Sequence, residues 1–423
     1  MTQLPTGWTL ATVPDVADIL DSKRVPLNAD ERSQRINGKA IDSLIPYYGA
    51  TGQVGYVDSY IYDENLVLLG EDGVPFLDAL KKKAYRISGK SWVNNHAHVL
   101  RANTQVLDWR LLEAQLNTLN YVGYVSGSTR LKLTQAAMNK LPIFVPPLNE
   151  QCRIADKLDT TLARVDALND RLARITPLLK RFRQSVLAAA TSGRLTEDWV
   201  LQYSLPEAHQ CTLKEVIKVS SGDGLTAKNM NSDGGIPVFG GNGINGYHDQ
   251  HNVNESTIVI GRVGYYCGSV HLTPEKAWVT DNALKVAYDK QYINKKFLYY
   301  SLLGNDLRKN VSSTAQPVIS GQKIYSLPFR LPVIEEQTEI VRRVETLFAF
   351  ADRLEARLQS AQTAAERLTP ALLAKAFRGE LVPQDPNDEP ATELLRRLRE
   401  ARAADTASKP KRGRAAKAPT VSE

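Results

Sequence analysis

Basic, amide and aromatic side chains are concentrated in two stretches of the chain, residues 1–148 and 205–333. Lysine and arginine neutralise phosphates, while arginine, asparagine and glutamine can read base edges in the major groove of DNA. The candidates in the first stretch are Tyr47, Tyr48, Tyr56, Lys81, Lys82, Lys83, Arg86, Lys90 and Arg130. Those in the second stretch are Asn242, Asn245, Tyr247, Arg262, Lys276, Lys295, Lys296, Arg308, Lys309, Gln316, Gln322 and Lys323. For any one of them, a solvated surface side chain is the simpler interpretation.

A glycine-rich loop, GGNGING at 240–246, lies within the second stretch. It contains GxGxxG spacing and also an FxGxG that is similar to an S-adenosylmethionine loop. A nucleotide-binding loop must follow a strand and open a helix, but the sequence continues as YHDQHNVNES, which has no helical pattern. We therefore interpret the loop as a turn, whose glycines would let Asn242 and Asn245 come close to a ligand.

Catalytic and metal-binding patterns are missing from the sequence. His96 and His98 alternate as on a strand, and His248 and His251 flank a loop, but neither pair has a third ligand at zinc-like spacing. The chain contains no GxSxG, HExxH, GxxxxGK[ST] or [DN]PP[YF] motif. We expect a chain that is not itself an enzyme and binds no metal or cofactor.

A long segment occurs twice, at 141–196 and 327–382. The two copies align without a gap and share 18 identities in 56 pairs, including a Glu-Gln pair at 150–151 and 336–337. A period of 186 residues indicates a duplicated half-molecule, since solenoid repeats span only about 20–50 residues.

Each copy carries apolar residues at alternating spacings of four and three, which is typical of a coiled-coil seam. Large residues in the first copy face alanines in the second, so we predict that the two helices pair within the chain; two unrelated amphipathic helices are the alternative. Pro177 and Pro370 predict a kink or restart. The predicted seam is Ile154, Leu158, Val165, Leu168, Leu172, Ile175 and Leu179 with Ile340, Val344, Leu347, Leu354, Leu358, Leu368 and Leu372.

The globular stretches are also related to each other, because residues 45–73 match residues 236–264 with 10 identities in 29. Both read as mixed helix and strand with many glycines. We predict an α+β fold with two recognition domains in pseudo-two-fold arrangement, separated by an antiparallel coiled coil of two long helices. The predicted divisions are a domain at 1–148, a helix at 149–204, a domain at 205–333, a helix at 334–384, and a short helix with a disordered tail at 385–423.

Composition sets limits on the class of protein. The charged content is 23%, no apolar run is long enough to cross a membrane, and the start lacks a signal-peptide pattern. The three cysteines form no CxxC pair, and we expect a cytoplasmic protein. Residues 401–423 hold six basic and two acidic residues, which accounts for +4 of the net charge of +7. Such a tail could attract nucleic acid or have no role.

Antiparallel helices would place the ends joined by residues 205–333 next to each other, so an ordinary domain could bridge them. Two related but diverged domains on such a spacer would read two unlike half-sites on double-stranded DNA. A non-enzymatic scaffold that joins two protein partners, with no DNA sequence preference, would have the same architecture. An autonomous methyltransferase is opposed by the missing catalytic motif.

The chain resembles the specificity subunits of type I restriction–modification systems. The resemblance rests on LPTGW near the start, the glycine-tyrosine segments at 45–73 and 236–264, and the paired LPIFVPPLNEQ (141–151) and LPFRLPVIEEQ (327–337). The ending AFRGELVPQDPNDEPATELLRRLR (376–399) is also similar, so the resemblance covers nearly the whole chain.

The resemblance implies two target-recognition domains, each reading one half of a gapped, asymmetric DNA sequence. It implies helices that set the gap and dock two methyltransferase (modification) subunits, which carry S-adenosylmethionine. Motor–nuclease (restriction) subunits, with ATP and magnesium, are further implied partners.

Overall fold

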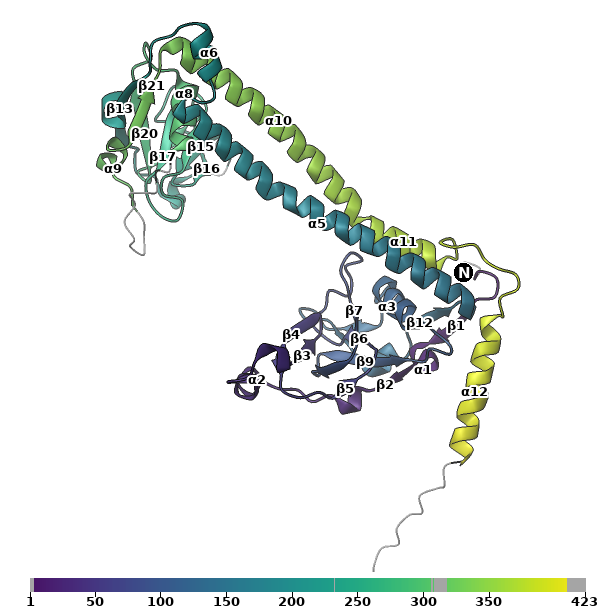
Figure 1. The fold of residues 1–423 in the computed structure, drawn as a ribbon. Coiled ribbons are helices and arrows are strands. Elements are labelled where there is room, and N and C mark those ends of the chain that lie inside the picture. The colour runs from purple at the N-terminus through teal and green to yellow at the C-terminus, as the bar shows by residue number, and fades with distance from the viewer. Residues whose placement is uncertain (1–3, 232, 306, 308–317, 409–423) are drawn as a thin grey trace, which may run out of the picture. The chain divides into compact units, whose positions relative to one another are not determined.

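The computed structural model describes residues 4–231, 233–305, 307 and 318–408. The chain divides into two compact units: unit 1 comprises residues 1–171 and 361–423, and unit 2 comprises residues 172–360. Each unit contains one β-rich domain and a part of each long helix (Figure 1). Side chains of the long helices belong to the cores of both units.

Unit 1 begins with a strand that later pairs with the strand leading into the long helix. Its main sheets have the strand orders β2-β9-β6-β7 and β4-β3-β8-β5. Its strands are β1 (Thr9–Thr12), β2 (Ala17–Ile19), β3 (Ile45–Gly49), β4 (Gly52–Val57), β5 (Tyr62–Asp63), β6 (Leu66–Gly70), β7 (Ala84–Ile87), β8 (Lys90–Val93), β9 (Ala97–Ala102), β10 (Val125–Ser126), β11 (Lys132–Leu133) and β12 (Pro142–Val145). Its helices are α1 (Val13–Val16), α2 (Ala29–Ile36), α3 (Trp109–Thr118), α4 (Gln135–Met138), the first part of α5 (Leu148–Ser192), α11 (Leu368–Phe377) and α12 (Ala391–Ser408).

Unit 2 repeats this plan. Its sheets have the orders β14-β20-β17-β18 and β16-β15-β19, which match the corresponding strands of unit 1. Its strands are β13 (His209–Thr212), β14 (Ile217–Ser221), β15 (Ile236–Gly240), β16 (Gly243–His248), β17 (Ile258–Gly261), β18 (Val270–Leu272), β19 (Trp278–Val279), β20 (Ala283–Tyr288) and β21 (Pro328–Leu331). Its helices are the rest of α5, α6 (Glu197–Gln202), α7 (Leu213–Val216), α8 (Lys295–Gly304), α9 (Gly321–Tyr325) and most of α10 (Ile334–Glu366).

The duplication predicted from the sequence is confirmed at the level of strand register. The hairpins β3–β4 and β15–β16 each contain one register shift. It lies between Tyr47 and Tyr48 in unit 1 and between Val238 and Phe239 in unit 2. The same strand pairs in parallel with a later strand, β8 in unit 1 and β19 in unit 2. The central strands β6 and β17 are buried at every position, as expected for strands covered on both faces.

The long helices pair in antiparallel fashion inside each unit. In unit 1, Ile154 near the start of α5 shares a core with Leu373 of α11. In unit 2, Val186 near the end of α5 shares a core with Ile340 near the start of α10. Arg183 of α5 also donates to the carboxylates of Asp352 (2.6 Å) and Glu355 (2.9 Å) on α10. Intrachain pairing of the two helices is thus confirmed.

The predicted seam fails at two leucines in unit 1. Leu168 and Leu368 are each 41% exposed, whereas Ile154 and Leu358 are buried as predicted. The helix breaks at Arg367, because Pro370 has no N–H to donate to the carbonyl of the preceding turn. The restart rotates the following residues, so that Leu373 and Ala376 are buried instead.

Two other expectations about the helices also need correction. Helix α5 continues through Pro177 as one helix, so it does not restart there. Residues 401–408, which we assigned to the tail, continue helix α12. The predicted disorder at 409–423 lies outside the described residues.

The Glu-Gln pair of each repeat joins the long helix to its domain. Gln337 accepts a hydrogen bond from the backbone N–H of Asn294 (2.8 Å) and donates to the carbonyls of Tyr292 (2.8 Å) and Pro332 (2.9 Å). Asn294 is the residue that caps α8. Gln151 makes the same three bonds in unit 1, with Asp108, Val106 and Pro146. Both glutamines are fully buried, so each is bonded through both ends of its amide.

We predict that Gln337→Leu lowers the free energy of unfolding by roughly 2–4 kcal/mol, because one buried N–H and two buried carbonyls lose their partner. Urea unfolding followed by circular dichroism measures the change. Gln322→Leu, at an exposed position of α9, is the matched control and should change stability by less than about 0.5 kcal/mol. Equal effects of the two substitutions would contradict this role for Gln337.

Candidate nucleic-acid interface

The glycine-rich turn of unit 2 is joined tightly to the segment that follows β17. Ser269 donates a hydrogen bond to the carbonyl oxygen of Gly241 (2.9 Å). A Cβ on Gly261 would lie 2.2 Å from that same oxygen, and a Cβ on Gly241 would lie 2.8 Å from the carbonyl oxygen of Val263. Glycine is required on both sides because the two backbones touch. The turn joins two strands and opens no helix, as we interpreted it from the sequence.

Three predicted residues of this hairpin are exposed together. Asn242 lies in the turn, and Asn245 and Tyr247 alternate on β16, where Tyr247 is 44% exposed. Asn245 is the extra residue at the register shift of this hairpin, because Gly246 and Ile244 pair with consecutive residues of β15. The hairpin thus exposes two amides and a phenol along the turn and β16.

Two adjacent tyrosines that we did not predict extend from the joined segment. Tyr265 is 80% and Tyr266 is 45% exposed, and their rings contact edge to face with centroids 5.1 Å apart. Their segment is held by a hydrogen bond from the backbone N–H of Cys267 to the carbonyl of Gly264 (3.0 Å), and Cys267 is buried. The sequence signal that could have indicated these exposed tyrosines is the pair flanked by glycines in GYYCG, residues 264–268.

Unit 1 has different chemistry at the equivalent place. Asp72, which follows β6, accepts hydrogen bonds from His96 (3.0 Å) and Arg130 (2.7 Å). Burial opposes ionisation of Asp72, but the bonds from His96 and Arg130 outweigh it and hold the pKa of Asp72 below its usual value. Arg130 was a predicted contact and is exposed, although one of its donors is engaged by Asp72. Tyr56, on the hairpin strand β4, is 37% exposed.

Several predicted contacts of unit 1 are structural residues instead. Tyr47 is 1% exposed, its hydroxyl accepts from the N–H of Leu27 (3.1 Å), and it belongs to the core. Lys83 is 2% exposed and donates to the carbonyl of Asp78 (2.6 Å). Arg86 is tied to Asp159 of α5 at 2.9 Å. The remaining candidates in the unit are Tyr48, half-buried against Tyr85, and Lys90, which lies over the ring of Tyr60.

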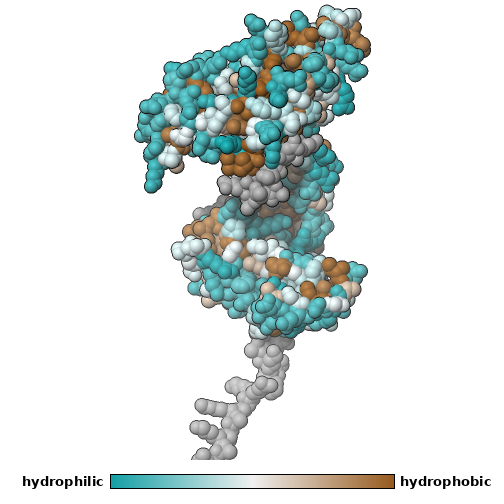
Figure 2. Space-filling model, turned by 90° about the vertical axis from the view of Figure 1, so that its left-hand side faces the viewer, coloured by the Kyte–Doolittle hydropathy of each residue, from teal (hydrophilic) through white to brown (hydrophobic). Residues whose placement is uncertain are grey.

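Unit 2 also scatters its candidates. Exposed Lys296 forms an ion pair with Glu345 of α10, and half-buried Lys295 donates to the carbonyl of Ser256 (3.4 Å). Lys276 and Gln322 are exposed, and Arg262 and Lys323 are half-buried. Arg308, Lys309 and Gln316 lie outside the described residues. On the face shown in Figure 2, hydrophilic residues cover most of each unit and apolar residues form small separate areas.

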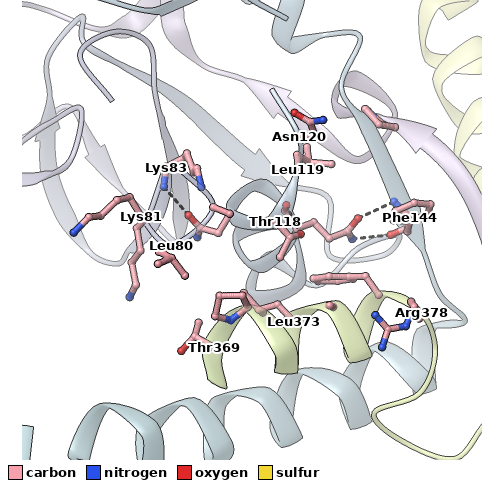
Figure 3. Close-up of a pocket in the computed structure, with 18 of the residues that line it drawn as sticks. Leu80, Lys81, Lys83, Thr118, Leu119, Asn120, Phe144, Thr369, Leu373 and Arg378 are labelled. Carbon is pink, nitrogen blue, oxygen red and sulfur yellow. Dashed lines mark hydrogen bonds between the residues drawn. The ribbon is translucent and has the colours of Figure 1, made fainter. Parts of the chain in front are cut away.

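Lys81 and Lys82 line a cavity of about 860 Å³ in unit 1 (Figure 3). The cavity lies between the segment that connects β6 to β7, the end of α3 with β12, and helix α11. Its walls include Leu80, Phe144 and Leu373. Two of the predicted basic residues are thus brought together beside apolar side chains.

The long helices also expose apolar residues away from their partner helix. Leu178 of α5 is 55% and Phe350 of α10 is 48% exposed. Within the described part of the chain, no helix is both long and apolar enough to cross a membrane. The described residues also contain no group of three or more histidine, cysteine or acidic side chains that could hold a metal ion.

Comparison with known proteins places this arrangement in one family. The family model for the type I restriction modification DNA specificity domain matches residues 5–176 and 207–361, one match on each repeat. The chain therefore belongs to the specificity subunits of type I restriction–modification systems, as the sequence resemblance had predicted.

Individual relatives match from about 70% to nearly all of the chain. The chain is 29% identical to the EcoKI specificity subunit of Escherichia coli (strain K12), over 97% of this chain and 98% of the relative. It is 33% identical to the StySPI specificity subunit of Salmonella potsdam, over 69% and 70%. A solved chain from a study of type I R-M complex assembly and conformational transition has the same fold, with a TM-score of 0.62 at 17% identity, covering 90% of this chain and 100% of that one. The HsdS subunit from Thermoanaerobacter tengcongensis matches with a TM-score of 0.52 at 17% identity, covering 90% and 98%.

We predict that Gly261→Ala destabilises unit 2 by about 1–3 kcal/mol, because its methyl group must push the glycine-rich turn away. Gly224→Ala is the control: nothing lies within 4 Å of a Cβ placed there, and its backbone is not left-handed. The control should change the unfolding midpoint little, or raise it slightly. Thermal unfolding of both variants tests this, and an unchanged midpoint for Gly261→Ala would contradict the close contact.

Proposed function

We propose that this chain is the DNA-reading subunit of a type I restriction–modification complex and that each unit reads one half of a bipartite, asymmetric target. The observation that supports this most directly is that the two repeated domains carry different side chains near their glycine-containing hairpins. Unit 2 presents amides and tyrosines there, whereas unit 1 presents an Asp72–His96–Arg130 cluster. Amides and guanidinium groups discriminate between different base edges.

The long helices have two roles in this proposal. They set the separation between the two half-sites, and their exposed apolar residues, such as Leu178 and Phe350, dock two modification subunits. The chain itself contributes recognition and no catalysis. The modification subunits carry S-adenosylmethionine, and motor–nuclease subunits, where present, use ATP and magnesium.

Base contacts are proposed for the hairpin residues, and phosphate contacts for the exposed lysines. Asn242 and Asn245 would read base edges in one half-site, with Tyr247 beside them. Lys276 and Lys90 lie on exposed surface and would contribute sequence-independent attraction. A scaffold without DNA preference is not favoured, because the chain belongs to a DNA specificity family along both repeats.

Coexpression of the chain with a modification subunit of its own system, followed by single-molecule sequencing of methylated DNA, tests the proposal. We expect one gapped motif with two different halves. Asn245→Ala should lower methylation, or relax the sequence preference, through one half-site only. The expected change is roughly 5- to 150-fold, since a base contact is worth about 1–3 kcal/mol. The control is Asn37→Ala, an exposed asparagine of unit 1 far along the chain from the hairpin. A continuous motif, or none, would contradict the proposal.

The role of the helices as a ruler has its own test. Seven residues inserted between Val165 and Leu172, together with seven between Leu358 and Ala365, keep each seam in register because a heptad is added to both helices. About 10 Å of added helix should lengthen the gap by up to about three base pairs and leave both half-sites unchanged. An unaltered gap would show that the helices do not set the spacing.

A further inference from the structure

Among the residues that the structure describes, the cavity beside Lys81 and Lys82 is much larger than the space at the equivalent place in the other unit. At the equivalent position of unit 2, offset by 186 residues, the space is about 220 Å³ instead of about 860 Å³. There, Phe144 is replaced by Arg330 and Phe377 by Thr191. The connection that forms one wall in unit 1 covers 71–83, whereas its counterpart in unit 2 covers only 262–269. The longer connection of unit 1 thus builds a cavity that the duplication alone does not produce.

The longer connection combines exposed leucines with lysines. Leu77 is 58% and Leu80 is 57% exposed, which is unusual for two leucines three residues apart in a loop. Lys81 and Lys82, which follow directly, are exposed. Figure 3 draws Leu80 and Lys81 on one side of the cavity, and Thr369 and Leu373 of α11, with Arg378 just after this helix, on another.

Hydrogen bonds of Lys83 and Ala84 fix the connection 71–83, which forms this wall of the cavity. Buried Lys83 donates to the carbonyl of Asp78 (2.6 Å), and its own backbone N–H donates to the side chain of Asn117 near the end of α3 (2.7 Å). The adjacent Ala84 N–H donates to the same oxygen (3.0 Å). The leucines are therefore presented by an anchored segment, which lowers the entropy lost when a partner binds.

The size and chemistry of the cavity select the class of ligand. Phosphates of DNA would satisfy the lysines but leave Leu77 and Leu80 exposed. A small anion would fill little of about 860 Å³. A polypeptide segment with apolar side chains on one face and carboxylates beside them satisfies both, as amphipathic helices do in apolar grooves. Arg378 already pairs with Glu380, so the available positive charge is that of Lys81 and Lys82.

We propose that this cavity docks an acidic, amphipathic segment of a modification subunit, and that it does so only in unit 1. The inference rests on the proposed function, because it assumes that modification subunits bind this chain. It adds that the two places where they bind are unequal: the subunit at unit 1 gains an anchor that the subunit at unit 2 lacks.

The test uses the full-length chain and a modification subunit of its own system. Subunit binding is measured without DNA, and DNA binding of the lysine variant is measured separately by an electrophoretic mobility shift assay. Native mass spectrometry gives the stoichiometry, and isothermal titration calorimetry gives the affinities. Leu77→Ser with Leu80→Ser, and separately Lys81→Glu with Lys82→Glu, should each weaken one of the two binding events at least about tenfold and leave the other unchanged. The controls are Leu201→Ser, an exposed leucine of unit 2, and Lys140→Glu, an exposed lysine of unit 1.

The outcomes separate the inference from the proposed function. Wild-type affinity in both cavity variants, or equal weakening of both binding events, would overturn the inference alone. Loss of DNA binding in the lysine variant, with subunit binding intact, would assign the lysines to DNA and would also overturn it. A wild-type chain that binds no modification subunit would overturn the proposed function and the inference together. Circular dichroism spectra that match the wild type confirm that the variants are folded.

Discussion

A buried glutamine at the start of each long helix determines how the rest of the molecule is connected. Its amide accepts from the residue that caps a domain helix and donates to two backbone carbonyls, so one side chain fixes the helix, the preceding strand and the domain together. Glutamate of the same length could not donate these bonds, and leucine could neither donate nor accept. In a low-dielectric interior such a satisfied network is rigid, because any displacement leaves polar groups unpaired.

Glu150 and Glu336, which directly precede the two buried glutamines, show how far the surroundings of these glutamines differ between the units. Glu336 is paired with Arg330 (2.9 Å) and accepts from Thr196 (2.8 Å). Glu150 instead accepts from the indole N–H of Trp8 (3.0 Å), and burial raises its pKa although that bond works in the opposite direction. The two units therefore share the backbone geometry at this place but differ in how the glutamate is paired. The two hairpins likewise share their backbone register but carry different side chains.

The sequence predicted the duplication, the pairing of the helices and the turn because glycine spacing and heptads follow directly from backbone geometry. It did not distinguish Tyr47 from Tyr48, because adjacent residues of a strand point to opposite faces and the local pattern does not show which face of β3 the core covers. Nor did it distinguish Lys83 from Lys81, because a connecting segment has no period that predicts which side chain turns inward. Leu368 was misplaced because a proline two residues later rotates the helix. These outcomes depend on contacts between distant segments, which a local pattern does not contain.

Unit 1 is assembled from both ends of the chain, and this has a consequence for biosynthesis. Leu373, Ala376 and Leu394 belong to the same core as Trp8 and Val16, so that core cannot close until the ribosome has made the last part of the protein. Unit 2, by contrast, is continuous from 172 to 360 and is complete earlier. Vectorial synthesis normally lets N-terminal domains fold first. Here the last contacts of the unit 1 core are synthesised after the whole of unit 2.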